Sequence, residues 1–258
     1  MAKGVSIKFK SYAESVPKIL ENTKLDSEIK THDKIVLKAS LKISTSVNTP
    51  VEFTEAVLSF CLANKNPSAQ VFIAEGSDGE DTMQLFEKAG YKNLAEKYSI
   101  GLIDLNNTEA EEVFKPNFNK FDSIMYPKIL KEGFIISLPK LAEDPELEMQ
   151  ASLSNMIGAF PARYYKGLFS KEKSKIRRWP LKFSLHDLLL CKMPEFALID
   201  TSDYDVILAG IPLEMDKQAA KLLGKEWKSV SHLRLISESI PESPSVKEKQ
   251  TENKEVQY

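Results

Sequence analysis

Two lysines and one polar tripeptide follow short apolar segments of the sequence, and their chemistry suits an anionic small molecule. Lys38 ends the segment KIVLK, and Lys140 follows the segment FIISLP. Ammonium groups attract carboxylates and phosphates, so two lysines at one site would hold an anion. The tripeptide Glu75–Gly76–Ser77 follows VFIA. Glu75 is a candidate catalytic base, and the backbone amides of Gly76 and Ser77 are candidate donors to an anion.

Four further polar residues complete the predicted binding site. Ser40 follows Lys38 closely, and Asp200 ends the segment FALID. Asn155 lies in the otherwise apolar stretch MQASLSNMIGAF, where an asparagine is locally unfavourable in a helix. The predicted ligand-binding residues are therefore Lys38, Ser40, Gly76, Ser77, Lys140, Asn155, Asp200 and Asp216. Each has a structural alternative: turn formation, a buried hydrogen bond for Asn155, or a helix-dipole contact for Asp216.

His186 is the second candidate catalytic residue, beside Glu75. An imidazole titrates near neutral pH and can act as a general acid or base. Its neighbour Asp187 does not form a ready dyad with it, because adjacent residues of a helix point in different directions. No nucleophile motif such as GxSxG accompanies this histidine. Asp187 is therefore expected to cap a helix or to be solvated.

The acidic segment EGSDGED lacks the spacing of the common phosphate-binding motifs. Its carboxylates could coordinate Mg²⁺, but a solvated acidic turn that caps the next helix is the favoured interpretation. The three histidines have no metal-ligand spacing, and two cysteines, Cys61 and Cys191, are too few for an iron–sulfur cluster within one chain. We therefore predict no metal site and no iron–sulfur cluster, and the sequence identifies no other cofactor.

Strands that alternate with helices must position these residues. Short, continuously apolar segments predict an α/β protein with a mainly parallel sheet and helices on both faces. In such a sheet, ligands bind at the carboxyl ends of the strands, where the candidate residues would gather. Thr49 and Asp144, each followed by a proline, are predicted to cap helices. We expect one domain over residues 1–236 and a polar, disordered tail over 237–258.

A strongly basic stretch over residues 163–182 contains one acidic residue, Glu172. It is interleaved with aromatic residues, and its cations are Arg163, Lys166, Lys171, Lys173, Lys175, Arg177, Arg178 and Lys182. Three interpretations stay open: a solvated loop, a lid over an anionic ligand, or a surface that binds single-stranded nucleic acid. The net charge of −2 weakens the case for nucleic acid.

The composition is typical of a globular cytoplasmic protein. The chain has 258 residues, 42% of them hydrophobic, which is enough for a buried core. No segment approaches the roughly 18 apolar residues of a membrane span, so we expect no membrane partner. The first residues, MAKGVSIKFKSYAES, lack the apolar region of a secretory signal. Two cysteines in apolar contexts suit free thiols in a reducing cytosol. The sequence does not predict an oligomeric state.

Seven segments occur in an order that resembles a known family. They are DKIVLKASL, TPVEFTEAVLSFC, VFIAEGS, FEKAGYKNLAEKYSIGLIDLN, FIISLPKL, SLSNMIGAFP and FALIDTSDYDVILAGIPLEMDKQAAKLLG. The family is the domain-of-unknown-function family 362, and the likeness spans roughly residues 33–235. Asn155 and Asp216 match residues that the family carries. The resemblance implies the same α/β fold that the alternation of strands and helices predicts.

The chain departs from the family's pattern at several strand ends. The family's Lys-Pro-Asn is KAS at residues 38–40, and its Lys-Thr-His is KLA at residues 140–142. The clustered cysteines of many relatives, which suggest iron–sulfur or redox roles, are missing. The chain thus resembles a trimmed, divergent member, and a loss of catalytic chemistry is one implication of the resemblance.

These observations predict a cytosolic α/β protein that binds an anionic small molecule at the carboxyl ends of its strands. Whether it is also an enzyme stays open. One alternative is a non-catalytic binding or assembly scaffold. A second alternative is a nucleic-acid-associated protein that acts through residues 163–182.

Overall fold

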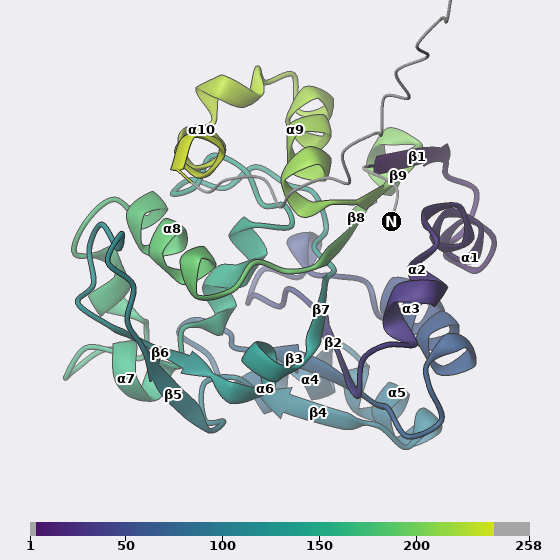
Figure 1. Ribbon diagram of the computed structural model, residues 1–258, viewed down its shortest axis with the longest axis horizontal. Helices are drawn as coiled ribbons and strands as arrows, with labels where there is room; N and C mark the ends of the chain where they lie inside the picture. Colours follow the sequence, from purple (N-terminus) through teal and green to yellow (C-terminus); the bar gives the residue numbers. More distant parts are fainter. Residues whose placement is uncertain (1–3, 240–258) are drawn as a thin grey trace, which may run out of the picture.

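The computed structural model describes residues 4–239 of the chain. Within these residues a seven-stranded sheet has the order β1–β9–β8–β7–β2–β3–β4, and β5 pairs with β6 separately (Figure 1). The strands are β1 (Gly4–Lys8), β2 (Lys34–Lys38), β3 (Gln70–Glu75), β4 (Gly101–Asp104), β5 (Ala110–Val113), β6 (Ile124–Pro127), β7 (Phe134–Ser137), β8 (Phe196–Thr201) and β9 (Val206–Gly210). Strands β2, β3, β4, β7 and β8 are parallel, whereas β9 is antiparallel to both β8 and β1. The predicted mainly parallel α/β sheet is confirmed.

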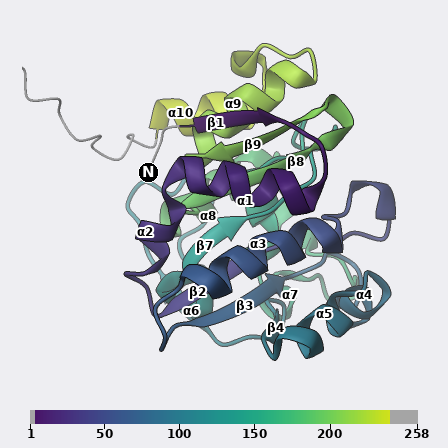
Figure 2. The ribbon, with the colours of Figure 1, turned by 90° about the vertical axis from the view of Figure 1, so that its right-hand side faces the viewer.

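Helices pack on both faces of the sheet, as predicted. They are α1 (Tyr12–Thr23), α2 (Leu25–Ile29), α3 (Val51–Asn64), α4 (Thr82–Lys88), α5 (Tyr91–Tyr98), α6 (Lys128–Glu132), α7 (Ala162–Tyr165), α8 (Leu181–Cys191), α9 (Pro212–Leu222) and α10 (Ser231–Ser239). Figure 2 shows α1 and α3 lying over one face of the sheet. Helices α8, α9 and α10 contribute to the apolar core of the other face. No helix within residues 4–239 is long and apolar enough to span a membrane.

The central strand β2 is covered on both faces, which explains its continuously apolar sequence. Ile35 and Leu37 pack with α1 and α3 in one core, whereas Val36 packs in the core that includes α8. Successive side chains of a strand point to opposite faces, so a strand covered on both faces must be apolar throughout. Lys38 ends this strand and is fully buried as well.

Two predicted helix starts are wrong. Helix α3 begins at Val51 with Pro50 before it, and the Thr49 hydroxyl instead donates to the carbonyl of Leu138. The Asp144 carboxylate accepts the amides of residues 146 and 147 as a cap does, but a turn follows instead of a helix, and Glu148 after it has a φ of 67°. The chain then runs through turns to a 3₁₀ helix over Ser154–Ala159.

Two further helix boundaries lie at Gly90 and near the start of the predicted tail. The break at Gly90 separates α4 from α5, and Gly90 has a φ of 83°, which favours glycine. Helix α10 ends at Ser239, so residues 237–239 of the predicted tail are helical. The remainder of that tail, residues 240–258, lies outside the described residues.

Candidate ligand-binding site

An open cavity of about 500 Å³ lies at the carboxyl ends of β2 and β3. Its lining comes from four segments: residues 40–44, 75–78, 144–158 and 172–181. From β2 the chain proceeds to β3 and β4 on one side and later returns to β7 on the other. The strand order therefore reverses beside β2, and in open α/β sheets ligands bind outside the strand ends at such a point.

A buried ion pair forms the floor of this cavity. Lys38 Nζ donates to Glu75 Oε1 at 3.0 Å, to Asn155 Oδ1 at 3.2 Å and to the carbonyl of Ala39 at 2.8 Å. All three ammonium hydrogens are thus used inside the protein. Burial lowers the pKa of Lys38, and the neighbouring Glu75 carboxylate partly offsets this effect. Lys38 does not line the cavity, so it holds Glu75 rather than a ligand.

Glu75 does line the cavity, but its carboxylate is also engaged. Besides Lys38, it accepts the amide of Gly76 at 2.6 Å and the amide of Leu41 at 3.1 Å. The Ser77 hydroxyl donates to the carbonyl of Leu41, which ties the turn after β3 to the loop after β2. These contacts give a rigid floor in which both oxygens of Glu75 accept hydrogen bonds from within the protein.

The predicted anion donors of the turn after β3 are occupied as well. The Gly76 amide bonds to Glu75, and the Ser77 amide bonds to the Thr82 hydroxyl. Gly76 and Gly158 matter for a different reason. A Cβ atom at Gly76 would lie 2.2 Å from the carbonyl oxygen of Gly158, and one at Gly158 would lie 2.4 Å from Glu75 Oε1. The two glycines therefore allow the segments of the floor to approach closely.

Asn155 joins the floor to the segment that follows β7. Its amide nitrogen donates to the carbonyl of Lys38 at 2.9 Å and to the Ser137 hydroxyl at 3.1 Å. Asp216 on α9 supports the same segment, because its carboxylate accepts both the amide and the hydroxyl of Ser152. Burial raises the pKa of Asp216 to about 7. Asp216 thus positions the segment and lies outside the cavity lining.

Three other predicted site residues lie elsewhere. Lys140 pairs with Asp203 at 3.1 Å, and the Asp200 carboxylate accepts the Tyr12 hydroxyl, so both belong to the ends of β7 and β8. His186 is buried in α8, where its Nδ1 contacts Asn119 and Asp187; Asp187 is buried too, so the expectation that it is solvated and apart from His186 is wrong. None of the three lines the cavity. Ser40, Glu75, Gly76, Ser77 and Asn155 are the predicted site residues that the structure brings together there.

Lys173 is the cation that the fold brings to the cavity wall. Its side chain is fully buried, and Nζ donates to the carbonyls of Gly76 at 2.6 Å and Gly158 at 3.2 Å. Burial lowers the pKa of Lys173 to about 8, against the opposing effect of Asp78 and Glu75. In the sequence Lys173 is one of eight cations of the basic stretch, and no local pattern distinguishes it from the others. The stretch thus forms part of the cavity wall, as the lid interpretation requires.

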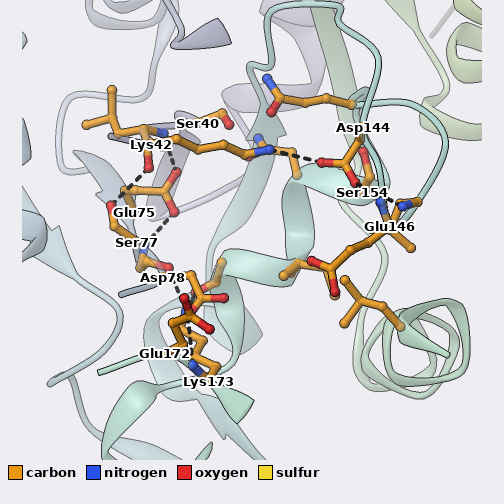
Figure 3. A pocket seen from close by; sticks show the side chains of 18 of the residues that line it. Ser40, Lys42, Glu75, Ser77, Asp78, Asp144, Glu146, Ser154, Glu172 and Lys173 are labelled. Carbon is orange, nitrogen blue, oxygen red and sulfur yellow. Dashed lines mark hydrogen bonds and ion pairs between the residues drawn. The ribbon is translucent and has the colours of Figure 1, made fainter. Parts of the chain in front are cut away.

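Two more ion-pair groups close the wall. Arg177 contacts Asp78 at 2.5 Å and Glu146 at 2.8 Å. Burial alone would lower the pKa of Arg177, but the two carboxylates outweigh this effect and raise it. Lys42 reaches from the loop after β2 to Asp144 at 3.1 Å (Figure 3). These pairs join the segments that follow β2, β3 and β7 to the basic stretch.

The structure offers no ready metal centre within residues 4–239. No group of three or more histidine, cysteine, aspartate or glutamate side chains there is arranged to hold a metal ion. In the acidic turn after β3, Asp81 caps α4 by accepting the amide of Gln84 at 3.0 Å. Cys61 is buried and Cys191 is partly buried, and both are free thiols.

Comparisons with known proteins agree with this fold. The family model described as "Domain of unknown function (DUF362)" matches residues 29–212. No curated protein matches the chain. One similar solved structure is the lactate racemase apoprotein from Thermoanaerobacterium thermosaccharolyticum, with a TM-score of 0.60 and 14% sequence identity. The match covers 87% of this chain and 58% of the racemase chain, and at this identity it supports the α/β fold alone.

Proposed function

The chain belongs to the DUF362 family, and from this premise we propose that it binds a small anionic molecule in the cavity at the ends of β2 and β3. The cationic contacts of this proposal are Lys173 and Lys42, in place of the lysines at positions 38 and 140. Binding, rather than a reaction centred on Glu75, is the function that the geometry supports best.

The state of Lys173 is the observation that carries the proposal. An ammonium group has three hydrogens, and two of those of Lys173 meet neutral carbonyl oxygens. Within residues 4–239 no carboxylate forms an ion pair with it, although the side chain is fully buried. A buried charge without a counterion is unfavourable, so an anion that accepts the third hydrogen would stabilise this arrangement.

The acidic residues of the cavity do not argue for a cationic ligand. Asp78 and Glu146 share Arg177, and Asp144 is paired with Lys42. Glu75 accepts three hydrogen bonds from within the protein. Among the described residues, four of the five carboxylates that line the cavity contact a cation, with Glu172 as the exception, whereas no carboxylate contacts Lys173 Nζ.

A cytosolic location and a carboxylate-sized ligand fit the same proposal. Free Cys61 and Cys191 suit a reducing compartment. The racemase that shares this fold is named for lactate, which is a small carboxylate. A scaffold without a ligand is the competing function, and it would leave Lys173 Nζ without a contacting anion.

Ligand-induced stabilisation tests this function. Acetate and inorganic phosphate, each titrated at constant ionic strength, should raise the midpoint of thermal unfolding, because a ligand that binds the folded state stabilises it. Lys173→Met should abolish the increase. Lys171→Met is the matched control, since Lys171 is exposed, lies two residues away and does not line the cavity. The proposal fails if neither anion stabilises the wild type, or if Lys173→Met responds as the wild type does.

A further inference from the structure

An unpartnered hydrogen-bond acceptor lies in the wall of the same cavity. Gln150 lines the cavity and is only 3% exposed. Its Oε1 atom is buried and has no hydrogen-bond partner within the described residues. Other buried atoms there also lack partners, on Tyr126, His186 and His232, but none of those residues lines the cavity. Buried polar groups are almost always paired, so an unpaired acceptor at a cavity wall calls for an explanation.

The orientation of the Gln150 amide is fixed by its other half. Nε2 donates to the carbonyl of Val47 at 2.7 Å and to the carbonyl of Lys140 at 3.0 Å. Both amide hydrogens are therefore used, and exchanging nitrogen and oxygen would place an acceptor against two carbonyls. The backbone of Gln150 is held too, because its amide and carbonyl pair with Ala142. Gln150 thus presents an acceptor, and only an acceptor, in a fixed position.

A ligand that satisfies Oε1 must bring a hydrogen-bond donor. The donor could belong to a hydroxyl or to an ammonium group, and the surroundings favour the hydroxyl. Gln150 is neutral, and the carboxylates on the neighbouring segment, Asp144 and Glu146, are already paired with Lys42 and Arg177. A ligand ammonium group would have to compete with Lys42 and Arg177 for these carboxylates, whereas a hydroxyl needs no countercharge.

We propose that the anionic ligand of this cavity also carries a hydroxyl group, which donates a hydrogen bond to Gln150 Oε1. This inference rests on the proposed function, in which Lys173 holds the anionic group. Recognition of a hydroxyl by a buried acceptor gives selectivity, because an analogue without the hydroxyl leaves that acceptor unpaired. Hydroxycarboxylates and hydroxylated phosphate esters share the required chemistry.

Two matched pairs of probes separate these sources: glycolate against acetate, and glycerol 1-phosphate against propyl phosphate. In calorimetric titrations of the wild type, we expect the hydroxylated member of at least one pair to bind about tenfold more tightly. The pair that shows the difference identifies the anionic group. Equal affinities within both pairs would overturn the inference but leave the proposed function standing. Binding of none of the four probes would overturn both.

A variant assigns the difference to Gln150. Gln150→Met keeps the length of the side chain and removes the acceptor, so the hydroxylated probe should lose its advantage while the other probe keeps its affinity. Gln84→Met, on the exposed side of α4, is the matched control and should preserve the advantage. A full advantage in a folded Gln150→Met protein would overturn the inference. If this variant does not fold, the comparison of probes on the wild type still decides.

Discussion

Lys38 Nζ lies 3.0 Å from Glu75 Oε1, and the two side chains are 0% and 4% exposed. They belong to adjacent parallel strands, β2 and β3, whose carboxyl ends meet below the cavity. This buried ion pair holds the two strand ends that form the floor of the cavity. Because a buried charge is unfavourable without its partner, loss of either residue should disturb the floor.

Removing one partner of this pair should destabilise the fold. Lys38→Met leaves a buried carboxylate without its cation, and such a loss costs about 3 kcal/mol or more. Lys34→Met on the same strand is the control, because its pair with Glu132 is solvent-exposed and contributes under about 1 kcal/mol. Urea unfolding at pH 7 measures both. Similar losses in the two variants would show that the buried pair has no special role.

Close packing at Gly158 provides a second test of the floor. In Gly158→Ala, the new Cβ would lie 2.4 Å from Glu75 Oε1 and 2.8 Å from Lys38 Nζ, so the pair must move. We expect a loss of about 2 kcal/mol or more in the free energy of unfolding, together with weaker acetate binding. Gly224→Ala is the comparison, because that site has open space and only the strain of a φ of +70°. Unaltered acetate affinity in Gly158→Ala would contradict the role given to the floor.

Much of this site follows from local sequence. The runs KIVLK and VFIA are apolar because β2 and β3 are covered on both faces, and the residues after parallel strands must meet at one edge. Ser40, Glu75 and Ser77 accordingly line the same cavity. The small strand β1 was not predicted, although its half-buried alternation is a strand signal.

The roles of the lysines could not be predicted in the same way. A lysine at the end of a strand looks free in the sequence, yet Lys38 points into a shell of acceptors supplied by Glu75 and by Asn155, 117 residues away. Lys173 looks like one solvated cation among many, and its burial depends on the carbonyl of Gly76, 97 residues earlier. Contacts of this range are set by tertiary packing and leave no local pattern.

His232 should make the protein sensitive to acid. Burial lowers its pKa from 6.5 to about 4, and this effect outweighs the opposing effect of the Leu147 backbone. The folded state therefore requires the neutral ring, so stability present above pH 6.5 is lost as the pH falls towards 4, by up to about 3 kcal/mol. In His232→Leu this loss should disappear. Urea unfolding at pH 7 and pH 4.5 measures it, and an unchanged difference between the two pH values would contradict the prediction.

Anion binding should depend on the proton of Lys173. Burial lowers the pKa of this lysine to about 8, so it is charged below pH 8 and loses its charge as the pH rises above that value. Acetate keeps its charge from pH 7 to pH 10, which makes it a suitable probe. We expect its association constant to fall by up to about tenfold per pH unit above 8, and calorimetric titration at pH 7, 8, 9 and 10 measures this fall.

Two variants assign the pH dependence to one lysine. Lys173→Met should bind acetate weakly at every pH, with no decrease specific to the range above pH 8. Lys42→Met removes a second cation of the cavity lining, whose side chain is 47% exposed and paired with Asp144. It should lower the affinity for acetate yet keep the same pH dependence, because the buried ammonium is intact. If wild-type affinity stays constant from pH 7 to pH 10, or if Lys42→Met alone abolishes the decrease, Lys173 is not the group that holds the anion.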